Sequence, residues 1–262
     1  MELQLDVHLI TDVGLARERN EDRCGAFTPE EPATLAERGR LFVVVDGMGG
    51  HAGGDVAAEI TVQALPASYL QGEWHGADET LRRAFVAANA AIERRAAAEP
   101  ANHGMGAAAV AAAVIGEGAF VAHMGDCRAY LIRGGQTTRL TSDHTWVEER
   151  VAAGQLTVDE AKVHHYRHVL TRALGGDDVA EPTVRELDFH PGDVLALCSD
   201  GLWGVVEEDE MAAVAGTLLD ATTVARRLVE LALERGGPDN ISIAVIRALP
   251  AENHDGRVAP PA

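Results

Sequence analysis

Three apolar stretches of this sequence each end close to a carboxylate. They are residues 41–45 before Asp46, residues 119–124 before Asp126, and residues 193–198 before Asp200. An aspartate beside a glycine after a strand usually marks only a turn, because aspartate accepts backbone hydrogen bonds and glycine tolerates positive φ angles. Three such carboxylates in equivalent positions favour a shared chemical role instead.

A fourth carboxylate, Asp239, lies just before the apolar run 241–247. In an antiparallel sheet the end of one strand lies beside the start of its neighbour, so four carboxylates can meet at one edge. Converging carboxylates repel each other unless a cation lies between them. An all-oxygen ligand set selects magnesium, manganese or calcium over zinc or copper. One bridging carboxylate would give a two-metal site with ions roughly 3.5–4 Å apart, and the Gly47 carbonyl is a further candidate ligand.

An arginine accompanies these acidic residues. Arg17 lies three residues before Asn20, Glu21 and Asp22. An arginine beside acidic residues is most often a surface ion pair of little consequence. Near a pair of cations, however, the planar guanidinium is suited to phosphate oxygens. Cations and an arginine together point to chemistry on a phosphoryl group.

Composition narrows the class of protein. The 262 residues carry 22 Lys and Arg against 41 Asp and Glu, a formal net charge of −19, and this charge argues against binding to nucleic acid or anionic membranes. No apolar run reaches the ~20 residues of a membrane helix, and the N-terminus lacks the features of a secretory signal. The three cysteines fit no zinc or redox spacing. We therefore expect a cytoplasmic protein with reduced thiols.

The pattern of apolar residues predicts an antiparallel α+β protein. The predicted strands are residues 5–11, 41–45, 119–124, 129–133, 136–140, 185–188, 193–198 and 241–247. The predicted helices are residues 55–65, 77–99 (with Asp78 as the cap), 146–153, a short one from Thr157, and 220–235. Gly134 and Gly135 separate two of the strands closely enough for a hairpin, which favours antiparallel pairing over a doubly wound sheet. The alanine-rich residues 107–114 are ambiguous, since propensity predicts a helix and the following turn predicts a strand.

These motifs, in this order, resemble the bacterial metal-dependent serine/threonine protein phosphatases of type 2C. The resemblance covers about residues 7–247. It rests on the motifs TDVGLARERNED, LFVVVDGMGGHAGGD, GMGAAA, HMGDCRAYLIR, LTSDHT, LTRALGG, GDVLALCSDGLWG and PDNISIAVI. It implies a β-sandwich of two antiparallel sheets flanked by α-helices on both sides, with the alanine-rich segment as a strand. We expect a single catalytic domain over residues 1–249 and a disordered tail over residues 250–262.

The resemblance also implies roles for individual residues. It implies two Mn²⁺ or Mg²⁺ ions, with a third weaker site. The implied metal ligands are Asp46, Gly47, Asp126, Asp200 and Asp239. Arg17 would bind the substrate phosphate. The implied catalytic residues are Arg17, Asp46, Asp200 and Asp239, and Glu21 and Asp22 would hold metal-bound waters.

The implied reaction is hydrolysis of phosphoserine and phosphothreonine by water activated at a binuclear centre. The implied partners are phosphorylated proteins of a bacterial Ser/Thr kinase system, and we expect a monomer. Two alternatives remain open, a phosphopeptide-binding pseudophosphatase and a hydrolase of small phosphomonoesters.

Some positions depart from the family pattern. Ala107 and Ala108 replace threonines, and Cys127 stands where relatives have a serine, which we interpret as an inert buried thiol. Met48 follows the Asp-Gly pair, as in bacterial relatives, where some eukaryotic members have a histidine. The acid that protonates the leaving group is therefore left open, and His51 is interpreted as a loop residue.

The segment 143–168 matches a variable flap over the site. Its histidines at 164, 165 and 168 are interpreted as part of a solvated flap rather than a zinc site. Asp143 is interpreted as a helix cap, with support of the third cation as the alternative. Trp146 and Trp203 are interpreted as packing residues.

Overall fold

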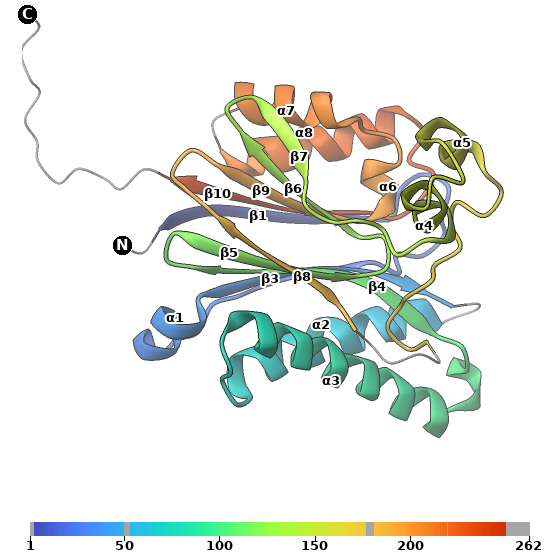
Figure 1. The fold of residues 1–262 in the computed structure, drawn as a ribbon, viewed down its shortest axis with the longest axis horizontal. Helices are drawn as coiled ribbons and strands as arrows, with labels where there is room; N and C mark the ends of the chain where they lie inside the picture. The colour runs from blue at the N-terminus through green and yellow to red at the C-terminus, as the bar shows by residue number, and fades with distance from the viewer. Residues whose placement is uncertain (1–2, 50–52, 177–180, 219, 250–262) are drawn as a thin grey trace, which may run out of the picture.

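Two five-stranded antiparallel sheets pack face to face in the computed structural model, which describes residues 3–49, 53–176, 181–218 and 220–249 (Figure 1). The first sheet has the order β1 (Gln4–Asp12), β10 (Ile241–Leu249), β9 (Val194–Cys198), β6 (Arg128–Arg133) and β7 (Gln136–Arg139). The second has the order β2 (Arg23–Phe27), β3 (Arg40–Met48), β4 (Gly106–Ile115), β5 (Gly118–Met124) and β8 (Thr183–Asp188).

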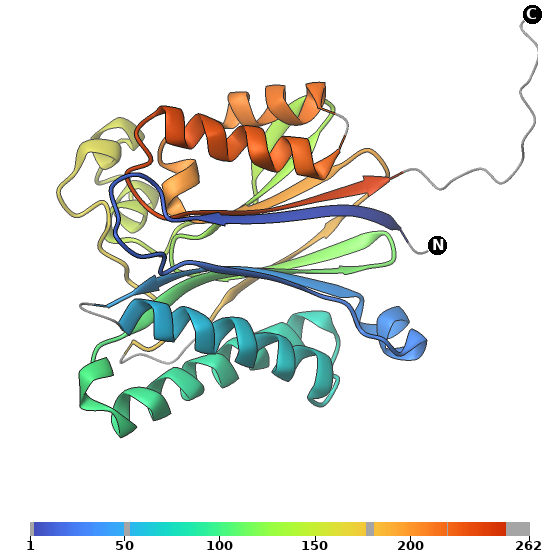
Figure 2. The same ribbon diagram turned by 180° about the vertical axis from the view of Figure 1, so that it is seen from behind.

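Helices cover the outer face of each sheet (Figure 2). Helices α2 (Gly53–Gln71) and α3 (Ala77–Ala98) pack on the second sheet, and α7 (Glu208–Thr217) and α8 (Ala221–Glu234) pack on the first. The shorter elements are α1 (Pro32–Arg38), η1 (Pro100–Asn102), α4 (Trp146–Ala152), α5 (Val158–Val163) and α6 (Asp200–Trp203). The predicted sandwich flanked by helices is therefore confirmed.

Alternating side chains of the strands separate three apolar layers. In β3, Leu41, Val43 and Val45 belong to the layer beneath α2 and α3. Phe42 and Val44 belong to the layer between the two sheets. This follows from the two-residue period of a strand, which sends successive side chains to opposite faces. Because both faces are covered, the strand is apolar throughout and reads as a continuous run rather than an alternation.

The alanine-rich segment forms strand β4, although local propensity favours a helix. It is paired with β3 on one side and β5 on the other. Ala107, Ala109, Ala111 and Ala113 face the helices, and Ala108, Val110, Ala112 and Val114 face the other sheet. Tertiary packing therefore overrides propensity here, and the small side chains let helices and the opposite sheet approach β4 closely.

All eight predicted strands and the five predicted helices are present with shifted bounds. Strand β2 and helices α1, α6 and α7 were not predicted. Asp78 is not the cap of α3, because that position is Gly76, and Asp78 instead pairs with Arg82 at 2.7 Å. The single domain over residues 1–249 stays a prediction, and the tail 250–262 and His51 lie outside the described residues.

Replacing Ala111 by leucine should test the packing of β4. Ala111 is fully buried beneath α2 and α3, so the added atoms must displace neighbours. We expect Ala111→Leu to lower the free energy of unfolding by about 1–3 kcal/mol. Ala97→Leu on the exposed face of α3 is the matched control, with a change within about 0.5 kcal/mol. Urea denaturation measures both, and equal stabilities would contradict the close packing of β4.

Candidate active site

The strand register brings the predicted carboxylates to one end of the sandwich. Asp46 lies near the C-terminal end of β3, opposite Ala108, and the end of β5 pairs with the neighbouring residue of β4. Asp126 follows in the connection from β5 to β6. On the other sheet, Ile243 of β10 lies opposite Cys198 of β9. Asp200 begins α6 directly after β9, and Asp239 lies just before β10. Because the end of β9 lies beside the start of β10, both residues lie at the same edge of this sheet.

The electrostatics show that these carboxylates act on one another. Burial raises the pKa of Asp46 well above its usual range, and the negative charges of Asp22, Asp200, Asp126 and Asp239 raise it further. This is the repulsion expected when several carboxyl groups share one poorly hydrated region. The structure therefore gathers the four residues that the sequence analysis placed together, along with Asp22.

Asp22 and Asp126 have pKa values raised above that of an ordinary aspartate. Burial raises the pKa of each to about 7, and the charge of Asp200 adds to the effect in both cases. Asp22 is 1% exposed, and its Oδ2 accepts a hydrogen bond of 2.6 Å from the Ser199 hydroxyl. The Ser199 hydroxyl in turn accepts from the Ser242 amide at 2.9 Å. Asp22 is thus fixed to the first sheet, beside the chain that leads to Asp200.

Asp200 presents an oxygen with no partner in the described residues. Its Oδ1 is buried without a hydrogen bond, and burial raises the pKa of its carboxyl, with the charge of Asp239 adding to this. The nearby His168 and the Arg17 guanidinium act in the opposite direction. A buried acceptor without a partner costs about 1–3 kcal/mol, so this oxygen is a natural ligand position.

These residues fit hard divalent cations. The donors are all oxygens, the acceptor on Asp200 is unpaired, and a cation would offset the repulsion around Asp46. The fit is not that of a closed side-chain cluster, because no three His, Cys, Asp or Glu side chains of the described residues are arranged to hold a metal ion. Backbone carbonyls and water would therefore have to complete the coordination.

Two close backbone approaches at the site require glycine. A Cβ on Gly47 would lie 2.0 Å from the carbonyl oxygen of Gly54 and 2.7 Å from that of Glu21. A Cβ on Gly201 would lie 2.1 Å from the carbonyl oxygen of Asn240. Glycine at these positions lets the start of α2 pack on Gly47 and the Asp239–Asn240 segment pack on α6. The two Asp-Gly pairs thus serve chain packing as well as any role of their carboxylates.

Arg17 makes an ion pair with a predicted metal ligand. Its Nη2 donates to Asp239 Oδ2 at 2.6 Å, and the two side chains are 52% and 30% exposed. The hydrogen bond to Asp239 raises the pKa of Arg17, and the charges of Asp200 and Asp46 contribute to this. The guanidinium therefore lies at the open side of the carboxylates, where it can meet an incoming anion.

Asn240 positions the loop that carries Arg17, and the sequence analysis gave it no role. Its Nδ2 donates to the carbonyl oxygens of Val13 and Arg19, both at 2.9 Å, and its Oδ1 accepts from the Glu21 amide at 2.8 Å. Burial raises the pKa of the Glu21 carboxyl, and the charge of Asp55 adds to it. The Asp239-Asn240 pair before β10 is visible in the sequence. The role of Asn240 is not, because its hydrogen-bond partners lie more than 200 residues away.

The residues that depart from the family pattern are buried and inert. Ala107 and Ala108 are 0% and 2% exposed. The Cys127 thiol is buried, its Sγ lies 3.6 Å from the Ala108 carbonyl oxygen, and burial raises its pKa well above the usual range. A thiol with a raised pKa is a poor nucleophile, which agrees with the interpretation of Cys127 as inert. Cys24 and Cys198 are also free thiols.

The flap contains stacked rings rather than a metal cluster. Trp146 stacks on His164 with ring centroids 5.0 Å apart, and His164 stacks on His165 at 4.4 Å. Tyr166 lies against His165 at 4.0 Å. No zinc cluster forms among these residues in the part of the chain that the structure describes. His165 and His168 are exposed, which agrees with the interpretation of this segment as solvated.

Asp143 is not a helix cap but is held by two arginines. The cap of α4 is Thr145, whose side chain accepts from the Glu148 amide. Asp143 is buried and pairs with Arg128 at 2.6 Å and with Arg139 at 3.0 Å. Two guanidinium groups contact its oxygens, and the cap interpretation was wrong. Support of the third cation by Asp143 stays a prediction.

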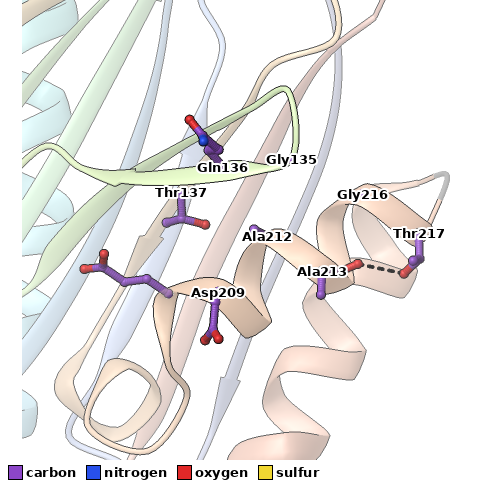
Figure 3. A pocket seen from close by; sticks show the side chains of 9 residues that line it. Gly135, Gln136, Thr137, Asp209, Ala212, Ala213, Gly216 and Thr217 are labelled. Atoms are coloured by element: carbon purple, nitrogen blue, oxygen red, sulfur yellow. Dashed lines mark hydrogen bonds between the residues drawn. The ribbon is translucent and has the colours of Figure 1, made fainter.

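An open hollow of about 670 Å³ lies elsewhere, between the β6–β7 turn and α7 (Figure 3). Its lining residues are Gly135, Gln136, Thr137, Glu208, Asp209, Ala212, Ala213, Gly216 and Thr217. None of them is a predicted site residue. The carboxylate cluster, which combines perturbed pKa values with an unpaired acceptor, is therefore the candidate active site.

No helix among the described residues is both long enough and apolar enough to cross a membrane.

Comparison with known proteins identifies the family. The family model described as Protein phosphatase 2C matches residues 10–241. The serine/threonine protein phosphatase PstP of Mycobacterium tuberculosis is 38% identical over 237 residues, covering 90% of this chain, and the chain spans 43% of that relative's length. The structure of the S. agalactiae serine/threonine phosphatase is similar with a TM-score of 0.86 and 31% identity, covering 94% of this chain and all of that chain.

A second solved structure is that of the catalytic domain of PstP in complex with two manganese ions. It is similar with a TM-score of 0.80 and 34% identity, and the match covers 94% of this chain and 99% of that chain. The family match spans most of the sequence and agrees with the two-sheet sandwich. The chain therefore belongs to the protein phosphatase 2C family.

Proposed function

We propose that this chain is a metal-dependent protein phosphatase that hydrolyses phosphoserine and phosphothreonine monoesters. The observation that carries the proposal is the group of mutually repelling carboxylates around Asp46, with an unpaired oxygen on Asp200 and an exposed arginine beside it. Membership of the protein phosphatase 2C family and the manganese ions of the PstP catalytic domain support it. The cations we propose are two Mn²⁺ or Mg²⁺ ions, with a third weaker site.

Each residue has a proposed task. Asp46, Asp200, Asp239 and the Gly47 carbonyl hold the cation pair, and Asp126 with Asp200 holds the third. When bound, such cations lower the pKa of a water molecule and offset charge on the phosphate. Asp22 and Glu21 orient water around them.

Arg17 binds the oxygens of the transferred phosphoryl group, for which its planar fork is suited. To do so it must release Asp239, and a cation at Asp239 would take its place as the partner of that carboxylate.

The substrate setting is part of the proposal. We propose that the chain removes phosphate from proteins modified by a bacterial Ser/Thr kinase, because named phosphatases of bacteria are similar to it over most of its length. Two alternatives are a pseudophosphatase that binds phosphopeptides and a hydrolase of small phosphomonoesters. The presence of Asp46, Asp126, Asp200, Asp239 and Arg17 argues against the first.

Manganese-dependent phosphate release from a phosphothreonine peptide tests the proposal. We expect Asp200→Asn and Asp239→Asn each to lower kcat by at least about 100-fold, because one electrostatic contact to the reacting group is typically worth that much. Asp209→Asn, on the exposed wall of the distant hollow, is the matched control and should keep wild-type turnover.

Wild-type protein that binds manganese without releasing phosphate would favour the pseudophosphatase. Faster turnover of a small aryl phosphate than of every phosphopeptide would favour the phosphomonoesterase.

Substitution of Arg17 should separate phosphate binding from metal binding. Arg17→Ala removes the guanidinium, so we expect kcat/KM to fall by about 100-fold while manganese affinity is retained or increased, since Asp239 is released. Arg17→Lys keeps the charge without the fork and should recover only part of the loss. Arg19→Ala, on the same exposed loop, is the control. An Arg17→Ala enzyme with unchanged kcat/KM would exclude the proposed contact.

The metal-free protein should lose stability as pH rises from 5 to 8. The folded state holds protons on Asp22 and Asp126 up to about pH 7, and the unfolded state releases them near pH 4. The stabilising effect of these protons is complete below the unfolded pKa and is lost as pH rises through the folded pKa. Each proton so linked changes the free energy of unfolding by about 1.4 kcal/mol per pH unit.

Urea denaturation in a chelator at several pH values measures this fall. Asp22→Asn and Asp126→Asn should each flatten it, and added Mn²⁺ should offset it above pH 7. Asp193→Asn is the control, because burial would raise the pKa of Asp193 but its hydrogen bonds with Arg133 lower it instead. A metal-free protein that gains stability over this range would contradict the shared protonation of the site.

A further inference from the structure

The chain turn that carries Asp126 is held from one side by a histidine. The Gly125 amide donates to His144 Nδ1 at 3.3 Å, and the His144 amide donates to the Gly125 carbonyl oxygen at 3.0 Å. One residue therefore satisfies both backbone groups of Gly125, next to a proposed metal ligand. His144 comes from the LTSDHT motif, to which the proposed function gives no task.

The histidine ring is fixed in one tautomer. Because Nδ1 accepts from the Gly125 amide, the ring proton lies on Nε2, which is 3.0 Å from Thr183 Oγ1. His144 is 8% exposed, and its ring stacks on that of His123, with centroids 4.6 Å apart and planes at 17°. The stacked ring and the contact with Thr183 leave Nδ1 aimed at the turn.

A tryptophan holds the other side of the same turn. Trp203 Nε1 donates to the Asp126 carbonyl oxygen at 3.0 Å. The Arg128 guanidinium lies 3.4 Å from the centre of the Trp203 ring, and Arg128 makes two short bonds to Asp143, of 2.9 Å and 2.6 Å. Asp143 is the neighbour of His144 in the chain. The contacts therefore lead from the Asp126 turn through Trp203, Arg128 and Asp143 to His144, which contacts the same turn again.

The turn needs such support. Gly125 has φ of +96°, and a Cβ there would lie 2.4 Å from the Cβ of Ala108, so the turn runs close against β4. The charges of Asp200 and Asp143 repel the Asp126 carboxylate. The bonds from His144 and Trp203 fix both sides of the turn that carries this carboxylate, and they add no charge to the site.

We propose that His144 and Trp203 are positioning residues that hold Asp126 toward Asp200, so that the two carboxylates bind a divalent cation separate from the pair at Asp46. The inference rests on the proposed function, in which Asp126 is a ligand of this weaker site. It predicts that the weaker site depends on the hydrogen-bond acceptor at residue 144, and that the tighter pair of sites does not.

Calorimetric titration with Mn²⁺, using the full chain, tests this prediction. In wild type we expect a tight class of sites and a weaker class, and Asp126→Asn should remove the weaker one. His144→Leu removes the acceptor and should lower the affinity of the weaker class by about 10-fold or more, which is typical for loss of a group that orients a ligand. Trp203→Phe keeps the ring under Arg128 but loses the N–H, and should lower the same affinity.

His144→Asn provides the rescue. The asparagine Oδ1 takes about the place of Nδ1 and can accept from the Gly125 amide, although it cannot reach Thr183, so the weaker class should stay within about threefold of wild type. A merely structural role would make the asparagine and leucine variants alike. The tight class and the melting temperature, measured for each variant, show that the fold is intact.

The outcomes distinguish the positioning role of His144 and Trp203 from the proposed ligand role of Asp126. Loss of the weaker class in Asp126→Asn, but not in His144→Leu and Trp203→Phe, would overturn the positioning inference and leave the proposed function standing. Equal loss in His144→Asn and His144→Leu would also overturn it. A weaker class that survives Asp126→Asn would refute the role of Asp126 itself.

Discussion

Repulsion between carboxylates at one end of the β-sandwich is the constraint on which the site depends. Asp46 is surrounded by four other acidic side chains, and burial adds to their mutual cost. Such a group is unfavourable in isolation and persists only if the rest of the fold holds it together. The same repulsion, relieved by hard cations, is what a metal-dependent phosphatase would use to bind its ions.

The sandwich holds this group together because its antiparallel strands end at the same edge. Asp46 and Asp126 lie at the ends of β3 and β5, the two strands that flank β4 in one sheet. Asp200 and Asp239 lie next to the neighbouring strands β9 and β10 of the other sheet. The buried layers on both sides of each sheet fix the register, since a shift by one residue would turn every apolar side chain to the wrong face. Packing far from the site therefore sets the distances within it, and Gly47 permits the closest of the backbone approaches.

The sequence allowed the carboxylates to be placed but not the groups that hold them. An aspartate after an apolar run is visible along the chain, and the pairing of strands then follows from their order. The partners of Asn240 lie more than 200 residues away, and Ser199 bonds to an aspartate 177 residues away. Nothing local marks such contacts. Asp143 was misread for the same reason, because its position before a helix suggests a cap while its two arginine partners are set by the sheet.

The residues that hold the site share a chemical property. Asn240, Ser199, His144 and Trp203 all act through neutral hydrogen bonds, and each of them bonds to a backbone atom beside the site. Neutral donors and acceptors fix position without cancelling charge. The buried cationic partner Arg128 is directed to Asp143 rather than to Asp126 or Asp200. In the proposed function, the negative charge of the site would be left for ions to offset. The exception is Asp239, whose exposed partner Arg17 would have to move away when an ion and a phosphate bind.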